Sequence, residues 1–183
     1  VLMIDIVRLA NWVVPFLPET GTETYLKTKF WVTVSAASVV ALVVLAGFLN
    51  AWHPKITYKT LEINKPSGSM DKVRIVAASD VHMGTIIAKR KVGKLVDTML
   101  GLKPDIILFA GDVVDEDVQP VIRQNLGQDL LRMKAPLGVY AATGNHEDIG
   151  GADRATAYLN SHGLTLLRDS AIKVNDGFYL VGR

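Results

Sequence analysis

Hydrophobic and polar residues alternate along the chain in two different ways. The first fifty-two residues hold two long apolar runs separated by a polar link, whereas the remainder contains short apolar runs separated by amphipathic segments. Three of these runs are rich in β-branched and bulky side chains, which is typical of strands covered on both faces. They are Val73–Ser79, Asp105–Ala110 and Gly138–Thr143.

Helical periodicity fills the gaps between these runs. Apolar residues recur every three or four positions in residues 89–102, 119–133 and 152–161, which predicts three helices. Short strands are expected at residues 165–167 and 171–174, and Asp176-Gly177 predicts a hairpin turn into a last strand. Strands that alternate with helices predict a layered α/β domain. We place this domain at residues 73–183.

Residues 30–52 predict a transmembrane helix. They include no formally charged side chain, and Trp31 and Trp52 flank the run as an aromatic belt would. At about 1.5 Å per residue, the run is long enough to cross a hydrocarbon core of roughly 30 Å. Lysines lie on both sides of the run in nearly equal number, so the sequence does not predict the orientation or the side on which the domain lies.

The segments around this helix are harder to interpret. Within residues 1–29, the apolar part before Pro18 fits either the end of a membrane helix or an interfacial helix, and a polar link follows it. Residues 53–72 are expected to be a linker with an edge strand at Ile56–Ile63. Both ends of the sequence interrupt apolar runs, so we expect a fragment of a longer protein.

Composition adds little beyond this division. The formal charge is +2, from 20 basic and 18 acidic residues, so no nucleic-acid partner is predicted. The basic run Lys89, Arg90, Lys91 and Lys94 is read most simply as the solvated face of a helix, with contact to a phosphate or lipid headgroup as the alternative. No cysteine is present, which excludes disulfides and thiolate metal ligands.

Polar side chains follow each of the three predicted strands. Asp80 and His82 follow the first, Asp112 follows the second, and Asn145 and His146 follow the third. Ligands bind at the carboxyl ends of such strands. Carboxylate, amide and imidazole donors suit Mn, Fe or Zn, and a carboxylate on the central strand can bridge two cations. Three such strand ends in one chain indicate a metal centre.

The three blocks resemble the first signature motifs of the calcineurin-like metallophosphoesterase superfamily. They read Asp80-Val81-His82-Met83-Gly84, Gly111-Asp112-Val113-Val114-Asp115 and Gly144-Asn145-His146-Glu147. The preceding apolar helix is similar to that of the membrane-associated bacterial subgroup. The resemblance implies an α-β-β-α sandwich of two sheets flanked by helices, here truncated at its C-terminal end and preceded by the transmembrane helix.

The resemblance also implies the roles of the site residues. Asp80 and His82 would hold one divalent metal ion, Asp112 would bridge two, and Asn145 would hold the other. His146 would protonate the leaving oxygen or stabilise charge on the phosphoryl group, and Asp115 would orient His146. The implied enzyme is a metal-dependent phosphodiesterase or pyrophosphatase in which metal-bound hydroxide attacks phosphorus.

Membrane attachment suggests the substrate and the location. A lipid or cell-envelope phosphodiester delivered along the bilayer is the expected substrate class, and a bacterial inner membrane is the expected location. The competing hypothesis is a non-catalytic membrane protein that uses a degenerate metallophosphoesterase domain as a binding module. A nucleotide-binding α/β domain ranks third, because no glycine-rich phosphate loop follows the first strand.

One departure from the family matters. The family takes a further histidine and then a Gly-His-x-His block from downstream sequence, whereas the only later histidine here, His162, is expected to end a helix. We therefore expect the missing ligands beyond Arg183, and weak metal binding and little activity in this segment alone.

Overall fold

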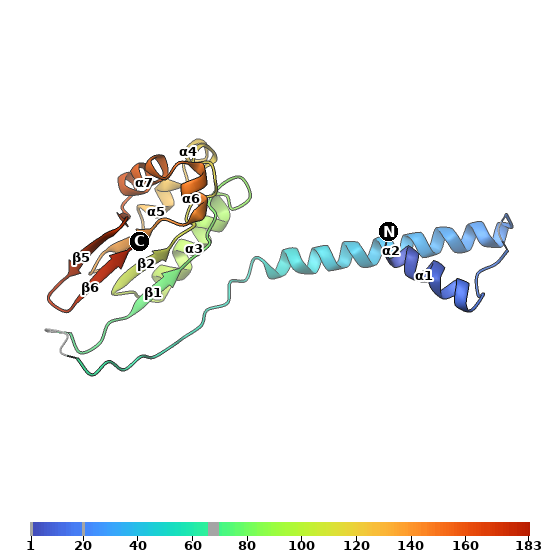
Figure 1. Ribbon diagram of the computed structural model, residues 1–183, viewed down its shortest axis with the longest axis horizontal. Coiled ribbons are helices and arrows are strands. Elements are labelled where there is room, and N and C mark those ends of the chain that lie inside the picture. Colours follow the sequence, from blue (N-terminus) through green and yellow to red (C-terminus); the bar gives the residue numbers. More distant parts are fainter. Residues whose placement is uncertain (1, 20, 66–69) are drawn as a thin grey trace. The chain divides into compact units, whose positions relative to one another are not determined.

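The computed structural model describes residues 2–19, 21–65 and 70–183 (Figure 1). The chain divides into two compact units, Val1–Thr60 and Leu61–Arg183, which are described separately below. The first unit contains helix α1 (Leu2–Val13) and the long helix α2 (Glu23–Asn50). The second unit contains all the strands and the remaining helices.

Helix α2 includes almost all of the predicted span. The side-chain oxygen of Thr22 accepts a hydrogen bond of 3.1 Å from the backbone N–H of Tyr25, which caps the helix start. The polar link expected to reach residue 29 is therefore already helical from Glu23. None of the 28 residues of α2 is buried, and its most apolar window has a mean hydropathy of 2.4. By length and composition, α2 is the one helix in the described residues that could cross a membrane.

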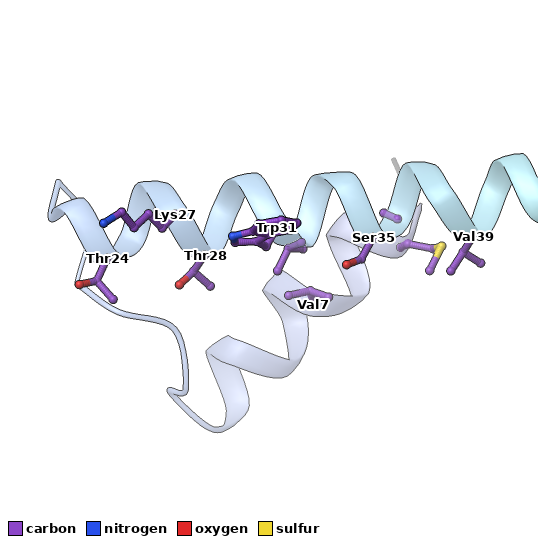
Figure 2. A pocket seen from close by; sticks show the side chains of 10 residues that line it. Val7, Thr24, Lys27, Thr28, Trp31, Ser35 and Val39 are labelled. Atoms are coloured by element: carbon purple, nitrogen blue, oxygen red, sulfur yellow. The ribbon is translucent and has the colours of Figure 1, made fainter.

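Helix α1 lies against the first half of α2. A groove of about 540 Å³ runs between the two helices, where Val7 of α1 faces Trp31 and Ser35 of α2 (Figure 2). Met3 of α1 and Val39 of α2 also line this groove. Beyond Val7, α1 diverges from α2 (Figure 2). After α1 ends at Val13, the backbone N–H groups of Phe16 and Leu17 donate to Oδ1 of Asn11 at 2.9 and 2.7 Å, which folds the chain back onto the end of the helix. The start of α1 thus reaches the level of Val39, within the apolar part of α2.

The prediction of an edge strand at Ile56–Ile63 is wrong. The described residues from His53 to Lys65 contain no helix and no strand, and Tyr58, Leu61 and Ile63 are largely exposed. Residues of high β propensity become a strand only when a neighbouring strand accepts and donates the ladder hydrogen bonds. No strand of the second unit pairs with this segment.

The second unit is built on a four-stranded parallel sheet in the order β1-β2-β3-β4 (Figure 1). Its strands are β1 (Ile75–Ala78), β2 (Ile106–Ala110), β3 (Val139–Ala142) and β4 (Thr165–Leu167). In the register of the sheet, Val76 of β1 lies beside Ile107 of β2, and Ile107 lies beside Val139 of β3. The first strand is shorter than the run Val73–Ser79 that predicted it. Residues 73–74 and Ser79 lie outside the ladder.

Helices connect successive strands of this sheet. They are α3 (Lys89–Gly101), α4 (Gln119–Arg123), α5 (Gly127–Leu130) and, after the short α6 (Asn145–Gly150), α7 (Ala152–Ser161). Right-handed connections that add neighbouring strands in one direction place their helices on one face of the sheet. The core agrees with this placement, because Ile107 and Phe109 of β2 share a buried cluster with Val96 of α3 and Leu159 of α7.

The helix predicted over residues 119–133 is interrupted. Asn125 adopts a left-handed conformation with φ of 54°, and this conformation ends α4 before α5 begins. Val121, Leu126 and Leu130 are nevertheless buried, as the apolar pattern indicated. The pattern therefore identified the inward-facing residues correctly, but it did not reveal the break.

The chain ends in an antiparallel hairpin of β5 (Ser170–Val174) and β6 (Phe178–Gly182). Its predicted turn is confirmed, with Asn175 in the left-handed conformation (φ 51°) just before Asp176-Gly177. Gly182 packs on Leu167, so the hairpin lies beside β4. The mixed α/β class is confirmed, and the described part of the second sheet consists of these two strands.

Candidate metal centre

Parallel pairing brings the ends of β1, β2 and β3 to one edge of the sheet. The pairing of the first two strands continues beyond their ends, because the N–H of Asp80 donates to the carbonyl of Gly111 at 3.3 Å and that of His82 donates to the carbonyl of Asp112 at 2.9 Å. The loops after β1 and β2 therefore leave the sheet as a bonded pair. This pair fixes the relative positions of the first two predicted motifs.

Potential ligand atoms converge at this edge in two overlapping groups. In the first, one ligand atom from each of Asp80, His82 and Asp112 lies within 4.8 Å of the other two. In the second, the same criterion joins His82, Asp115 and His146. The structure thus brings together five of the six residues predicted for the site. His82 belongs to both groups.

Three of these residues have unfavourable backbone conformations. Asp80, His82 and Asp112 all lie in the left-handed region, with φ of 54°, 49° and 51°. This region is uncommon for residues other than glycine, and such conformations persist where surrounding structure imposes them, typically at functional sites. Three of the seven non-glycine residues with positive φ in the described part of the chain are therefore predicted metal ligands.

The loops after β2 and β3 touch through two glycines. Gly111 has φ of 92°, and a Cβ atom on it would lie 3.0 Å from the Cα of Gly144. A Cβ atom on Gly144 would overlap the carboxylate of Asp112. This contact allows the N–H of His146 to donate to Oδ1 of Asp112 at 2.9 Å. The glycines of both motifs are therefore required by close approach of the backbones.

Asp115 lies between the two imidazoles of the site. Its Oδ1 is 3.1 Å from Nδ1 of His146 and 4.0 Å from Nδ1 of His82. The two imidazole rings meet edge to face with centroids 4.4 Å apart. This geometry is compatible with the predicted orienting role of Asp115, which stays a prediction.

Asn145 begins helix α6, directly before His146, and is exposed. Its position in the chain puts it at the same edge of the sheet. Its role as a ligand to the second cation also stays a prediction. Asn145 and the residues that follow it form the six-residue helix α6, which was not predicted from the sequence.

Glu147 is the residue that sequence reasoning missed. No role was predicted for it beyond its place in the third motif, yet it is only 1% exposed. One carboxylate oxygen accepts the N–H groups of Asp112 and Gly144 at 3.0 and 2.8 Å, and the other accepts that of Val114 at 2.7 Å. Glu147 thus joins the loops after β2 and β3. Glu147 accepts the N–H of the N-cap residue Gly144 as the glutamate of a capping box does, but glycine has no side chain to complete that motif, so the sequence carried only half of its signal.

His162 does not belong to the site. It caps the C-terminal end of α7, where its Nδ1 lies 2.7 Å from the carbonyl of Tyr158. A Cβ atom on Gly127 would overlap its ring, so the imidazole packs tightly against α5. The prediction that His162 ends a helix is confirmed.

The residues present fit divalent cations. Asp80 and Asp112 bring two carboxylates within 4.8 Å of each other, and Asp112 is only 8% exposed. Within the described part of the chain, neither carboxylate forms an ion pair with Lys or Arg. Like charges held this close repel unless a positive charge is added. Oxygen and imidazole donors select hard or borderline divalent metals.

Known proteins resemble the chain over most of its length. It is 31% identical over 160 residues to "Transmembrane protein with metallophosphoesterase domain" from Danio rerio, covering 85% of this chain and 36% of that protein. It is 30% identical to "Uncharacterized metallophosphoesterase" from Aquifex aeolicus, covering 73% and 50%. It is 29% identical to "UDP-2,3-diacylglucosamine pyrophosphatase LpxG" from Chlamydia muridarum, covering 63% and 36%. No solved structure gives a significant match.

These relatives are longer than the chain, which spans between about a quarter and a half of the first three curated proteins it matches. The family model described as "Calcineurin-like phosphoesterase" matches residues 73–182, a range that includes every strand and all three motifs. The chain therefore belongs to the calcineurin-like phosphoesterase family.

Proposed function

We propose that the protein carrying this chain is a membrane-anchored, metal-dependent phosphoester hydrolase, a phosphodiesterase or pyrophosphatase with a two-cation centre. The observation that supports this most directly is the convergence of Asp80, His82 and Asp112 within 4.8 Å. The match to the family model over residues 73–182 supports the reaction class.

Each residue has a distinct part in the proposed centre. Asp80 and His82 hold one cation, Asn145 holds the other, and Asp112 contributes to both because its strand lies between those of the other two motifs. When bound, such a pair supplies Lewis acidity to a phosphoryl group and activates water. Manganese, iron and zinc all suit this donor set.

In this proposal, His146 is the general acid that protonates the leaving oxygen. Asp115 accepts from Nδ1, which fixes the tautomer of the ring and leaves Nε2 to face the substrate. The protonated ring then gives its Nε2 proton to the leaving oxygen, and the charge on Asp115 stabilises the imidazolium before transfer.

An amphiphilic phosphodiester or pyrophosphate is the proposed substrate class. Helix α2 carries no charged side chain from Phe30 to its end at Asn50, so a membrane that it crossed would hold the domain close to lipids. The Chlamydia muridarum relative is named for a pyrophosphatase acting on UDP-2,3-diacylglucosamine, a nucleotide-linked lipid. The proposed location is a membrane, and the inner membrane in a bacterial source.

The test compares the detergent-solubilised full-length protein with its Asp112→Asn variant, because little activity is expected from the 183-residue segment alone. We expect Mn-dependent hydrolysis of bis(p-nitrophenyl) phosphate to fall at least about 100-fold in the variant, because a shared ligand is lost. Equal rates would contradict the proposed centre. Lipid-linked pyrophosphates and water-soluble esters are then assayed side by side, and activity confined to the soluble esters would exclude the proposed substrate class.

A further inference from the structure

The loop between β1 and α3 exposes an isoleucine beside the candidate metal centre. Ile86 is 80% exposed, although its neighbour Ile87 packs against the core. Two residues earlier, a Cβ atom on Gly84 would lie 3.2 Å from the Cβ of Asp115, so the base of this loop touches the site. A single exposed isoleucine is not by itself evidence of a binding surface, but this one lies beside the candidate site and next to a run of cations.

Positive charge is concentrated directly after this isoleucine. Lys89, Arg90, Lys91 and Lys94 lie within the first six residues of α3, and Lys89, Arg90 and Lys94 are exposed. No acidic residue occurs from residue 81 to residue 96. The apolar tip and the cations therefore form one continuous stretch. We call this stretch, Ile86 to Lys94, the basic loop.

We propose that the basic loop docks the catalytic unit on an anionic lipid surface, with Ile86 entering the lipid and the cations of α3 contacting the headgroups. Clustered lysine and arginine are attracted to anionic bilayers, and an apolar side chain among them adds buried area. A crossover helix begins at the carboxyl edge of a parallel sheet, so docking here would bring the metal centre to the lipid surface.

With α2 embedded in a bilayer, the link between the two units decides whether this surface can reach that bilayer. Helix α2 is apolar enough to be embedded, and residues 53–74 join it to β1. Fully extended, this link of about 22 residues spans at most roughly 75 Å. A compact unit of about 120 residues has a radius of gyration near 14 Å. The link is therefore long enough to let the carboxyl edge of the sheet approach the membrane, although β1 enters the sheet at the opposite edge.

Because the chain has no cysteine, a single introduced cysteine can report on docking. Ile86→Cys labelled with the dye NBD is placed in nanodiscs of phosphatidylcholine alone or with 30% phosphatidylglycerol. We expect at least a twofold rise in NBD emission, with a blue shift, only in the anionic discs, and its loss in 0.5 M NaCl. The matched control is Tyr179→Cys. Tyr179 is 68% exposed and lies outside the basic loop, on strand β6 of the terminal hairpin.

A second variant separates charge from misfolding. Lys89→Gln, Arg90→Gln and Lys94→Gln together should abolish the NBD response while hydrogen exchange in β2 stays unchanged. Equal NBD emission in both kinds of disc, or an equal response at residue 179, would overturn the proposal. Inorganic phosphate added to neutral discs tests for a simple anion site. A full NBD response to phosphate alone would also overturn docking on lipid. None of these readouts depends on hydrolysis, so the inference can fail while the proposed function stands.

Discussion

At the scale of single residues, the buried carboxylate of Glu147 connects the metal-binding loops. It accepts the backbone N–H groups of the predicted ligand Asp112, of Val114, and of Gly144, which directly precedes Asn145. Hydrogen bonds to a carboxylate are stronger than those between neutral groups, and here they are shielded from water. Glu147 is therefore a positioning residue, because it orients the ligands without belonging to either group of converging donors.

Replacing Glu147 with glutamine should loosen these loops. An amide keeps one acceptor oxygen but turns its NH₂ group toward backbone donors, so at least one buried N–H loses its partner, at a cost of about 1–3 kcal/mol. We expect faster amide hydrogen exchange at residues 112, 114 and 144, together with weaker Mn²⁺ binding. Glu116→Gln, an exposed neighbour, is the matched control. Unchanged exchange in Glu147→Gln would contradict this role.

Asp115 permits a different prediction, about catalysis rather than metal binding. Asp115→Asn keeps the side-chain size but removes the charge that faces Nδ1 of His146 at 3.1 Å. We expect kcat to fall about 100-fold or more, as for loss of general acid–base assistance, with KM and Mn²⁺ content almost unchanged. Loss of metal in this variant would instead make Asp115 a ligand, as its grouping with His82 and His146 allows.

The residues that were predictable share one property. Asp80, Asp112 and His146 follow apolar runs at strand ends, and parallel strands bring such ends together, so pattern alone indicated their proximity. Glu147 had no such signal, because its burial depends on backbone donors of a loop more than thirty residues earlier. The left-handed conformations of Asp80 and His82 were equally hidden, since sequence does not specify φ for Asp or His.

At the scale of elements, the break between α4 and α5 gives a prediction about stability. Asn125 holds φ of 54°, a region that asparagine tolerates and alanine resists. Asn125→Ala should lower the free energy of unfolding by about 1–2 kcal/mol, whereas Asn125→Gly should leave it almost unchanged. Urea dependence of hydrogen exchange in β2 measures both, since that buried strand reports global opening of its unit. A more stable alanine variant would mean that one continuous helix can form.

Predictions of helices and strands were wrong where the outcome depends on contacts between residues far apart in the sequence. The pattern of residues 119–133 satisfies a single helix, but the fold needs a turn at Asn125 so that both halves can bury their apolar residues. Ile56–Ile63 has strand propensity and no partner. By contrast, α3 and α7 were predicted almost to the residue, because one face of each packs continuously on the core.

At the scale of the whole molecule, the number of ligands predicts how this chain binds metal. In the proposed centre, Asp80, His82 and Asp112, whose ligand atoms converge, would give one cation three protein ligands, whereas Asp112 and Asn145 would give the second cation two. Affinity depends on ligand number, so we expect calorimetry of the 183-residue chain with MnCl₂ to show one weak site and a second weaker site. Asp112→Asn should weaken both sites, because the two share this carboxylate. Two equivalents bound with micromolar affinity would contradict this count and would require donors other than those identified in the three motifs.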